Sequence, residues 1–233
     1  MSIKSFLYTI AHESIIGKRG FVKIASIWFP LALIIYSIDI QNNRNLLLLS
    51  ISTVVAVLCW AMSCVLINNV TDRKTDLHAG KKRWTSIISG KKGTIIALIL
   101  LFVGSVSLVV SKGSAYALIP YFIAAAAGYL YSIPPIRFKG RGIAGIAAYS
   151  TSSACAYALV PGLLLQGESV LMGVLFIAVF SDKWINLHFH QIIDRNNDLA
   201  AGDRTYAAGV GISQARRSLS IAANASLLFL VLV

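Results

Sequence analysis

The sequence predicts an all-α fold, a polytopic bundle of transmembrane helices around a central cavity that opens to the cytoplasmic side. Hydrophobic residues make up 57% of the chain, charged residues 13%, and the mean hydropathy is +0.73. A soluble domain carries about 25% charged residues, so this chain lacks the charge of a soluble surface. Apolar runs of roughly 20 residues recur, and each is long enough to cross the hydrocarbon core as a helix.

Seven apolar runs are expected to span the membrane. They lie near residues 21–40, 47–68, 94–111, 115–132, 143–165, 169–188 and 215–233. We therefore expect one membrane-embedded domain over residues 1–233, with the lipid bilayer as its partner and no obligate protein partner. The chain stops inside the last apolar run, which predicts either a fragment or a natural protein shorter than its relatives.

The basic residues predict the orientation. The net charge is +12, and all but Arg44 and Lys112 of the 21 Lys and Arg residues lie in or beside the segments on one side. These segments are the N-terminus, 69–93, 133–142 and 189–214, together with Lys183 at the end of the sixth run. The positive-inside rule makes that side cytoplasmic, in a multi-pass protein of the cytoplasmic (inner) cell membrane. The charge then sets topology and requires no nucleic acid as a partner.

The first acidic motif follows the second span. Asn68, Asp72 and Asp76 are spaced i, i+4, i+8, so on a helix their oxygens share one face. Like charges at this spacing beside a bilayer are unfavourable, and a bound cation would remove that penalty. Carboxylate and amide oxygens are hard ligands that suit Mg²⁺. The alternative is a solvated loop with scattered acids.

A second acidic motif follows the sixth span. Asp194 and Asp198 again share a helical face, and the stretch 202–205 follows them. Two such clusters could hold two Mg²⁺ ions with a diphosphate between them, as a charge clamp on a leaving group. The cations that could assist are Arg73, Lys74, Arg83, Arg195 and Arg204. The repeated Asp-x-x-x-Asp also suggests two pseudo-symmetric halves that face one cavity.

The third motif is the stretch 131–142, Tyr-Ser-Ile-Pro-Pro-Ile-Arg-Phe-Lys-Gly-Arg-Gly. Pro134 and Pro135 end the fourth span and stiffen its exit. They are expected to aim Arg137 and Lys139 at the cytoplasmic mouth of the bundle. The alternative is an ordinary basic loop with a proline stop.

At these residues the sequence resembles the UbiA-type family of intramembrane prenyltransferases. Its first motif, Asn-x-x-x-Asp-x-x-x-Asp, matches residues 68–76, and its second, Asp-x-x-x-Asp, matches 194–198, with Gly202, Arg204 and Thr205 after it. The stretch 131–142 fits a third family motif. The resemblance covers roughly residues 20–233. The chain departs from the family pattern in two respects. Seven helices are expected here, whereas the family usually has nine. Residues 85–90 are Thr-Ser-Ile-Ile-Ser-Gly, whereas the family often has Arg-Pro-x-x-Ser-Gly at this place.

The resemblance implies Mg²⁺-dependent transfer of an isoprenyl group from an isoprenyl diphosphate to an acceptor, usually an aromatic quinone or pigment precursor. Ionisation would give an allylic carbocation in a hydrophobic tunnel. It implies catalytic roles for Asp72, Asp76, Asp194 and Asp198, which with Asn68 would ligate the metal. The residues expected to bind substrate are Asn68, Arg73, Tyr131, Arg137, Lys139 and Arg204.

Several other residues allow a functional or a structural interpretation. Tyr129, Tyr131, Tyr157 and Trp184 could stabilise the cation through their ring faces, or anchor span ends at the membrane interface. His188 and His190 could act as a base for the acceptor, or pack. We interpret the three cysteines, Cys59, Cys64 and Cys155, as small packing residues, because no metal-ligand spacing surrounds them.

Two rival functions remain open at this point. The CDP-alcohol phosphotransferases are also membrane-embedded and use paired Asp residues and Mg²⁺, but their signature contains an Asp-Gly dipeptide that this chain lacks. A cation-coupled transporter would need ionisable residues near the bilayer midplane. The predicted spans have almost no ionisable residues there, because the acids of the two motifs lie at the cytoplasmic ends.

Overall fold

A computed structural model describes residues 30–35, 45–73, 76, 89–200 and 202–232 of the 233-residue chain. Every regular element within these ranges is a helix, which confirms the predicted all-α class. The predicted N-terminal span at 21–40 falls largely outside the described residues, as does most of the basic connection 69–93.

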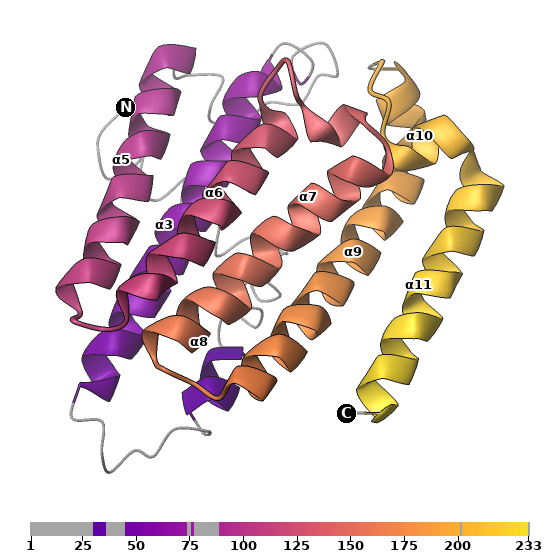
Figure 1. Ribbon diagram of the computed structural model, residues 1–233. Helices are drawn as coiled ribbons and strands as arrows, with labels where there is room; N and C mark the ends of the chain where they lie inside the picture. Colours follow the sequence, from indigo (N-terminus) through magenta and orange to yellow (C-terminus); the bar gives the residue numbers. More distant parts are fainter. Residues whose placement is uncertain (1–29, 36–44, 74–75, 77–88, 201, 233) are drawn as a thin grey trace.

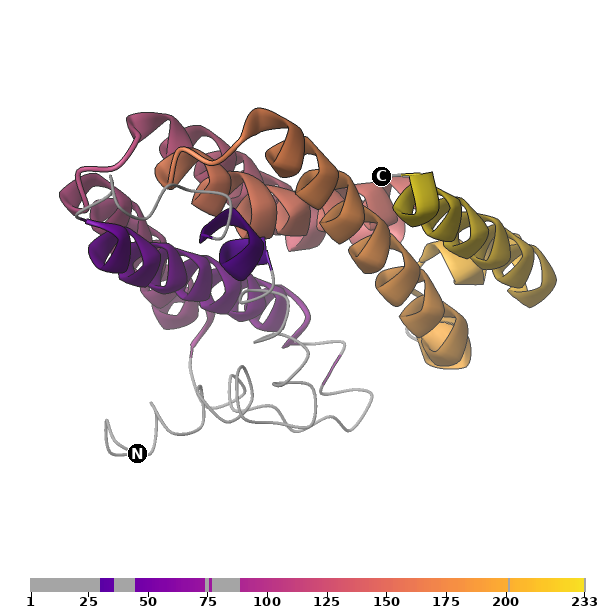
Figure 2. The same cartoon turned by 90° about the horizontal axis from the view of Figure 1, so that it is seen from below.

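The long helices form a row in which most pack against the next (Figure 1). They are α3 (Leu46–Thr71), α5 (Gly90–Val110), α6 (Leu118–Ser132), α7 (Ile143–Ala154), α9 (Ser169–Ala200) and α11 (Ile212–Leu232). Two short helices, α8 (Val160–Leu164) and α10 (Tyr206–Val210), join them. Helices α3 and α5 lie at one edge of the bundle and α11 at the other, as Figure 2 shows from below.

Five of the described helical segments are long and apolar enough to cross a membrane. They are Leu46–Thr71, Gly90–Val110, Ala115–Ser132, Ile143–Leu164 and Ser169–Ala200. These segments match the predicted second to sixth spans. Helix α11 occupies the region of the predicted seventh span, and the expected total of seven stays a prediction.

Helix α9 differs from the predicted span. We expected the sixth span to end at residue 188 and a connection to follow, whereas the helix continues to Ala200 and carries the second acidic motif on its last turns. Lys183, expected at the end of the span, therefore lies near the middle of the helix. Apolar periodicity ends where polar residues begin, but the side chains of Gln191 and Arg195 hydrogen-bond to backbone atoms of α10 and stabilise those turns.

The connections alternate between two ends of the bundle. One end, here called the far end, brings together Asn45, Ser111, Gly113, Leu164 and Gln166, which line one small pocket. The other end, here called the motif end, holds residues 71–73, 76, 133–142, 194–200 and 202–206. Gly142 forms an isolated backbone bridge with Thr205 there. All three sequence motifs therefore lie at one end of the molecule.

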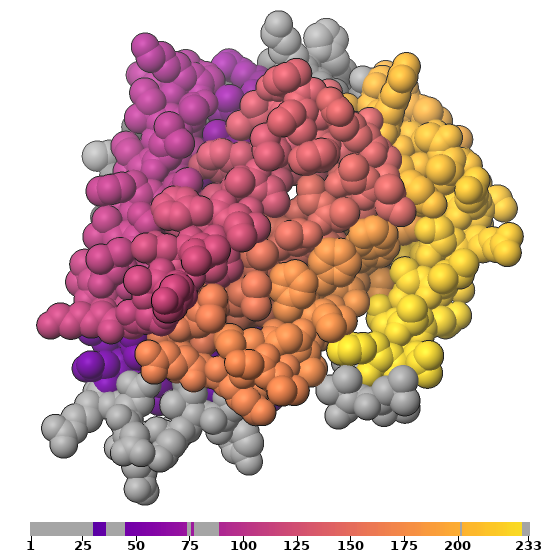
Figure 3. All heavy atoms as spheres, viewed as in Figure 1, coloured from indigo at the N-terminus to yellow at the C-terminus, as the bar shows by residue number. Residues whose placement is uncertain are grey.

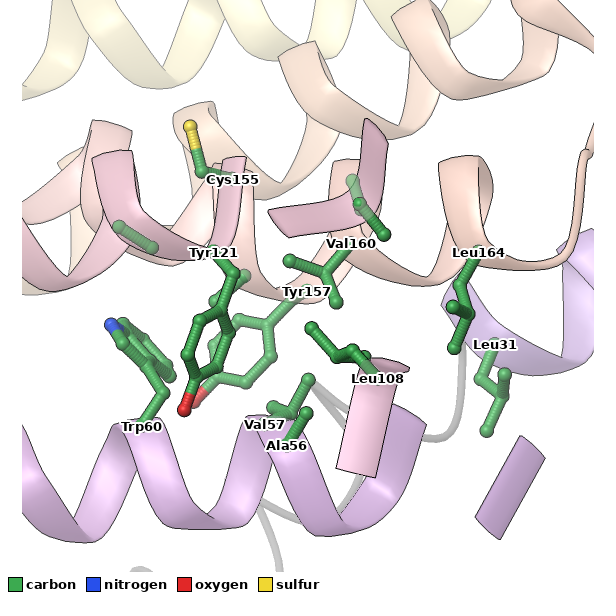
Figure 4. Packing of buried hydrophobic residues seen from close by; sticks show 14 of the residues in the cluster. Leu31, Ala56, Val57, Trp60, Leu108, Tyr121, Cys155, Tyr157, Val160 and Leu164 are labelled. Carbon is green, nitrogen blue, oxygen red and sulfur yellow. The ribbon is translucent and has the colours of Figure 1, made fainter. Parts of the chain in front are cut away.

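The core lies between α3, α6 and the α7–α8 segment (Figure 4). Trp60 and Val57 of α3 face Tyr121 of α6 and Tyr157 across this space. A single π-helical turn, η6 (Cys155–Leu159), interrupts the fifth span where Tyr157 enters the core. Such turns widen a helix locally and occur often at functional sites.

Helix α11 is much less integrated than the others. Ala215 is its one fully buried residue among those whose side chains the structure describes. In the space-filling view, a gap separates the second half of α11 from α9 (Figure 3). The first turns of α11, near α10, hold it to the bundle.

A glycine permits the closest approach between the third motif and the bundle. A Cβ atom on Gly145 would lie 2.6 Å from the carbonyl oxygen of Phe138, which is closer than real Cβ contacts allow. The 3₁₀ turn η5 (Phe138–Gly140) can therefore pack directly on α7 only because position 145 has no side chain.

We predict that Gly145→Ala destabilises the protein by about 1–3 kcal/mol, because the added methyl group displaces the 138–140 backbone. Thermal unfolding in detergent measures this. Gly173→Ala on α9 is the matched control, since nothing lies within 4 Å of that added atom and alanine favours a helix. Equal stability of the two variants would contradict the packing described here.

Candidate functional site

The end of α3 presents the first acidic motif in a helical register. The backbone N–H of Asp72 donates to the Asn68 carbonyl at 2.9 Å, and that of Asp76 donates to the Asp72 carbonyl at 2.8 Å. This i to i−4 pattern keeps the three residues on one face, as predicted from their spacing. Asp72 and Asp76 are each 8% exposed. Two carboxylates are thus buried at the motif end of the bundle.

The third motif supplies the cations that compensate Asp72. Lys139 Nζ lies 2.5 Å and Arg137 Nη2 lies 3.3 Å from Asp72 Oδ1. Lys139 is itself 8% exposed, so this ion pair is largely removed from water. Ser132 Oγ adds a hydrogen bond of 3.0 Å to Asn68 Oδ1. A buried carboxylate is costly unless paired, so these contacts stabilise the docking of 132–139 on α3.

Arg137 reaches two carboxylates from a strained backbone. Its φ of 37° is in the left-handed region, which costs a residue with a side chain about 1–2 kcal/mol. Its Nη2 atom lies 3.0 Å from Asp203 Oδ1, in addition to the contact with Asp72. Lys139 Nζ is also 3.7 Å from Asp203 Oδ2. The two cations thereby bridge an acid at the end of α3 to an acid just after α9.

One face of α9 holds the segment that carries Asp203. Gln191 Oε1 accepts from the Tyr206 N–H at 3.1 Å, and Arg195 Nε donates to the Ala207 carbonyl at 3.1 Å. Asp198 Oδ2 accepts from Thr205 Oγ1 at 2.8 Å. These α9 residues follow the i, i+4, i+7 spacing of one helical face. The second motif therefore also fixes the turn that presents Asp203.

Charged side chains from both acidic motifs lie within electrostatic reach of the same neighbouring groups. The carboxyl group of Asp198 lies near enough to Asp194, Asp203 and Lys139 for each of their charges to act on it. The hydroxyl of Tyr131 lies within electrostatic reach of Asp72, Asp198 and Asp203. In the residues that the structure describes, no three His, Cys, Asp or Glu side chains are close enough together to hold a metal ion. Lysine and arginine side chains lie between the acids instead.

Comparison with known proteins identifies the family. The sequence matches the UbiA prenyltransferase family over residues 27–233. The chain belongs to this family. The resemblance inferred from the three motifs is therefore confirmed, and the two rival functions, a CDP-alcohol phosphotransferase and a transporter, are set aside.

Two solved structures share the fold of this UbiA-family chain. One is a UbiA homolog from Archaeoglobus fulgidus bound to DMAPP and Mg²⁺, with a TM-score of 0.71 and 16% identity, over 89% of this chain and 73% of that one. The other is a UbiA homolog from the same organism bound to GPP and Mg²⁺, with a TM-score of 0.70 and 16% identity, over 88% and 71%. No curated protein sequence matches the chain.

The UbiA-family chain places its expected site residues at different depths. Asn68, Asp72, Asp76, Tyr131, Arg137, Lys139 and Asp198 are buried or half-buried at the motif end. Arg73 is half-buried one residue beyond Asp72. Asp194 is exposed, and the side chain of Arg204 is exposed while its carbonyl accepts from the Gly142 N–H at 3.4 Å.

Sequence reasoning missed three contributors. Ser132, Asp203 and Thr205 each contact a member of an acidic or basic motif, yet none was expected to do so. The signal was present, because all three lie inside the motif stretches 131–142 and 202–205. Their roles depend on pairing between segments far apart in sequence, which spacing alone does not reveal.

The ambiguous aromatic residues and histidines are placed as follows. Tyr129 hydrogen-bonds Ser63, Tyr131 lies 5.9 Å from Tyr149 between ring centroids, and Trp184 lies 5.6 Å from Phe180. His188 is buried edge-on against Tyr206 at 5.0 Å, which favours packing over proton transfer. Cys155 is buried and Cys59 and Cys64 are half-buried without disulfides, as expected of packing residues.

We predict that Arg137→Gln and Asp203→Asn are coupled by about 1 kcal/mol in a double-mutant cycle, because each variant removes the same bridge. Unfolding free energies in detergent give the coupling. The control cycle pairs Asp203→Asn with Arg141→Gln, an exposed arginine whose side chain donates to the Pro135 carbonyl at 3.0 Å. If the losses of unfolding free energy were additive in both cycles, the ion pair between Arg137 and Asp203 would be refuted.

Proposed function

We propose that this chain transfers an isoprenyl group from an isoprenyl diphosphate to a lipophilic aromatic acceptor within the membrane, in a Mg²⁺-dependent reaction. The observation that carries the proposal is the ion-pair network of Asp72, Arg137, Lys139 and Asp203. It joins the end of α3, the third motif after α6 and the segment that follows the second motif on α9, and we propose that this polar region is the substrate chamber. The Mg²⁺ and diphosphates bound by the two A. fulgidus homologs support the same chemistry here.

The donor atoms fit Mg²⁺. Asn68, Asp72 and Asp76 offer amide and carboxylate oxygens from one helical face, and Asp194 and Asp198 offer carboxylates from α9, which are the hard ligands that this ion prefers. In the described conformation, Lys139 and Arg137 already place positive charge on Asp72. The region therefore accommodates cations beside its acids. When bound, Mg²⁺ would neutralise charge on the diphosphate oxygens as the carbon–oxygen bond breaks.

Lys139 and Arg137 have a second role once substrate enters. Their contacts with Asp72 and Asp203 position them at the chamber, and the diphosphate oxygens are competing partners for the same donors. Arg137 can bind two oxygens at once through its planar guanidinium, whereas Lys139 acts as a point charge. We propose that these cations bind the diphosphate and hold it after it leaves.

The bond changes balance with an aromatic acceptor. The C1–oxygen bond of the isoprenyl diphosphate breaks, and the electron pair leaves with the diphosphate. The allylic cation bonds to a ring carbon of the acceptor, which then loses its proton to the medium or to the diphosphate. Tyr131, close to Asp72 and Asp198, presents a ring near the expected position of C1. The apolar bundle excludes water that would otherwise capture the cation.

We further propose that the chain is a single membrane-embedded domain of the cytoplasmic membrane, with the motif end and the N-terminus on the cytoplasmic side. The charge distribution supports this orientation, because Arg141, Arg137 and Lys139 lie at the motif end and Lys112 alone among described cations lies at the far end. No obligate protein partner is proposed.

We predict that Asp72→Asn, Asp76→Asn and Asp198→Asn each reduce Mg²⁺-dependent prenyl transfer by at least about 100-fold, because each loses a charged metal ligand. Mass spectrometry of products from several isoprenyl diphosphates and aromatic acceptors measures this. Glu168→Gln, an exposed acid at the far end, is the control and should retain activity. Full activity in the Asp variants, with the fold intact, would overturn the proposal.

We predict that a single cysteine at position 112 reacts with an impermeant maleimide from outside the cell, whereas one at position 141 reacts only after permeabilisation. The background chain has Cys59, Cys64 and Cys155 replaced by alanine, and both test positions are exposed. Labelling in the opposite pattern would reverse the proposed orientation without affecting the site.

A further inference from the structure

A buried charge lies far from the acidic motifs, in the middle of α9. Lys183 is 7% exposed and lies fourteen residues after the start of this 32-residue helix. Its Nζ atom is 2.8 Å from Asp182 Oδ2, and Asp182 has a side chain that is 62% exposed. A lysine at this depth of a membrane helix is costly and marks a functional position by default. The chemistry proposed above assigns it no role.

One aromatic ring lies beside Lys183, and a second ring packs against the first. Its Nζ lies 5.7 Å from the ring centroid of Tyr157, within range of a cation–π interaction. Tyr157 belongs to the π-helical turn and meets Trp60 of α3 edge-on, with 5.4 Å between ring centroids (Figure 4). Trp60 is 5% exposed, and its indole N–H has no hydrogen-bond partner among the described residues. Lys183, Tyr157 and Trp60 thus form a cluster, here called the inner cluster, that joins α3 to α9.

The inner cluster lies at nearly the same distance from the acidic motif on α3 as from the one on α9. Trp60 precedes Asp72 by twelve residues, which is about 18 Å of helix, and Lys183 precedes Asp194 by eleven, about 16 Å. The ring of Tyr131 at the motif end lies tilted against that of Tyr149 of α7, with 5.9 Å between ring centroids, and Tyr149 lies within electrostatic reach of Tyr157. Aromatic side chains therefore extend from the acidic motifs down to the inner cluster.

We propose that the inner cluster closes the isoprenyl-chain site and limits the chain to about three prenyl units. This inference rests on the proposed function, since it requires the diphosphate to bind at the acidic motifs. An alkyl chain that reached Lys183 would have to separate its ammonium group from Asp182 or Tyr157. Nothing in a hydrocarbon chain compensates that buried charge.

The length limit follows from the depth. An extended residue covers about 3.5 Å over three backbone bonds, so a prenyl unit with four chain bonds covers about 4–5 Å. Three units plus the bond to the diphosphate cover about 13–17 Å, which fits within the depth of about 16–18 Å, whereas four units cover about 17–22 Å. A fourth unit would collide with the inner cluster. Lys183 is then a specificity-determining residue of the same site.

The test compares binding, so it needs no acceptor. Purified protein in nanodiscs, with Mg²⁺, binds a radiolabelled two-unit isoprenyl diphosphate, and unlabelled isoprenyl diphosphates of one to six units compete. We expect affinity to increase up to three units and to fall by about tenfold or more at four. In Lys183→Met, which has similar length but no charge, we expect four- and five-unit compounds to bind within about threefold of the three-unit compound. Lys112→Met, an exposed lysine at the far end, should keep the wild-type profile.

A second measurement uses the unaltered chain and is independent of whether the variant folds. A three-unit isoprenyl diphosphate with a diazirine at its terminal carbon should label peptides containing Lys183 or Tyr157. Equal affinity of the wild type for all lengths, or labelling confined to other helices, would overturn this inference alone. Failure of every isoprenyl diphosphate to bind with Mg²⁺ would instead overturn the proposed function.

Discussion

Asp72 is buried at the end of a membrane helix, and a carboxylate in that position must be compensated by cations or by hydrogen bonds. Lys139 and Arg137 supply the compensation, and Arg137 adopts a left-handed backbone conformation to do so. The same two side chains also contact Asp203. Their ion pairs therefore hold together three segments that are far apart in the sequence. The cluster of charged side chains at the motif end is a consequence of this charge balance. Substrate binding at the site would have to exchange these ion pairs for contacts with a diphosphate and its metal ions.

The rest of the bundle separates two kinds of environment. The motif end concentrates charge, whereas the interior below it is lined by aromatic and aliphatic side chains as far as Trp60, Tyr157 and Lys183. A reaction through an allylic cation needs both, since the leaving diphosphate requires charge and the cation requires exclusion of water. The π-helical turn and Lys183 interrupt the apolar interior at a single depth. A buried lysine would be costly in a helix with a structural role alone, and in the proposal above it limits the length of the isoprenyl chain.

Much of this could be predicted from the sequence because the controlling patterns are local. Apolar runs located the five described spans, and the i, i+4, i+8 spacing placed Asn68, Asp72 and Asp76 on one helical face. The extent of α9 was not predictable, because its last turns are stabilised by contacts of Gln191 and Arg195 with α10 rather than by apolar periodicity. The roles of Asp203 and Ser132 likewise depend on pairing across more than sixty residues of sequence. Charge predicts a span boundary at Lys183, whereas α9 continues to Ala200 and Lys183 packs against Tyr157 near the middle of that helix.

The central claim is that the acids after α3 and on α9 bind one metal–diphosphate group between them. Crystals grown with an isoprenyl diphosphate and Mn²⁺ in place of Mg²⁺ would locate the metal by anomalous scattering. The account predicts anomalous peaks within about 2.3 Å of carboxylate oxygens of Asp72 or Asp76 and, separately, of Asp194 or Asp198, with the diphosphate bridging them. Peaks at one motif only, with the diphosphate elsewhere and the Asp72–Lys139 ion pair intact, would contradict it.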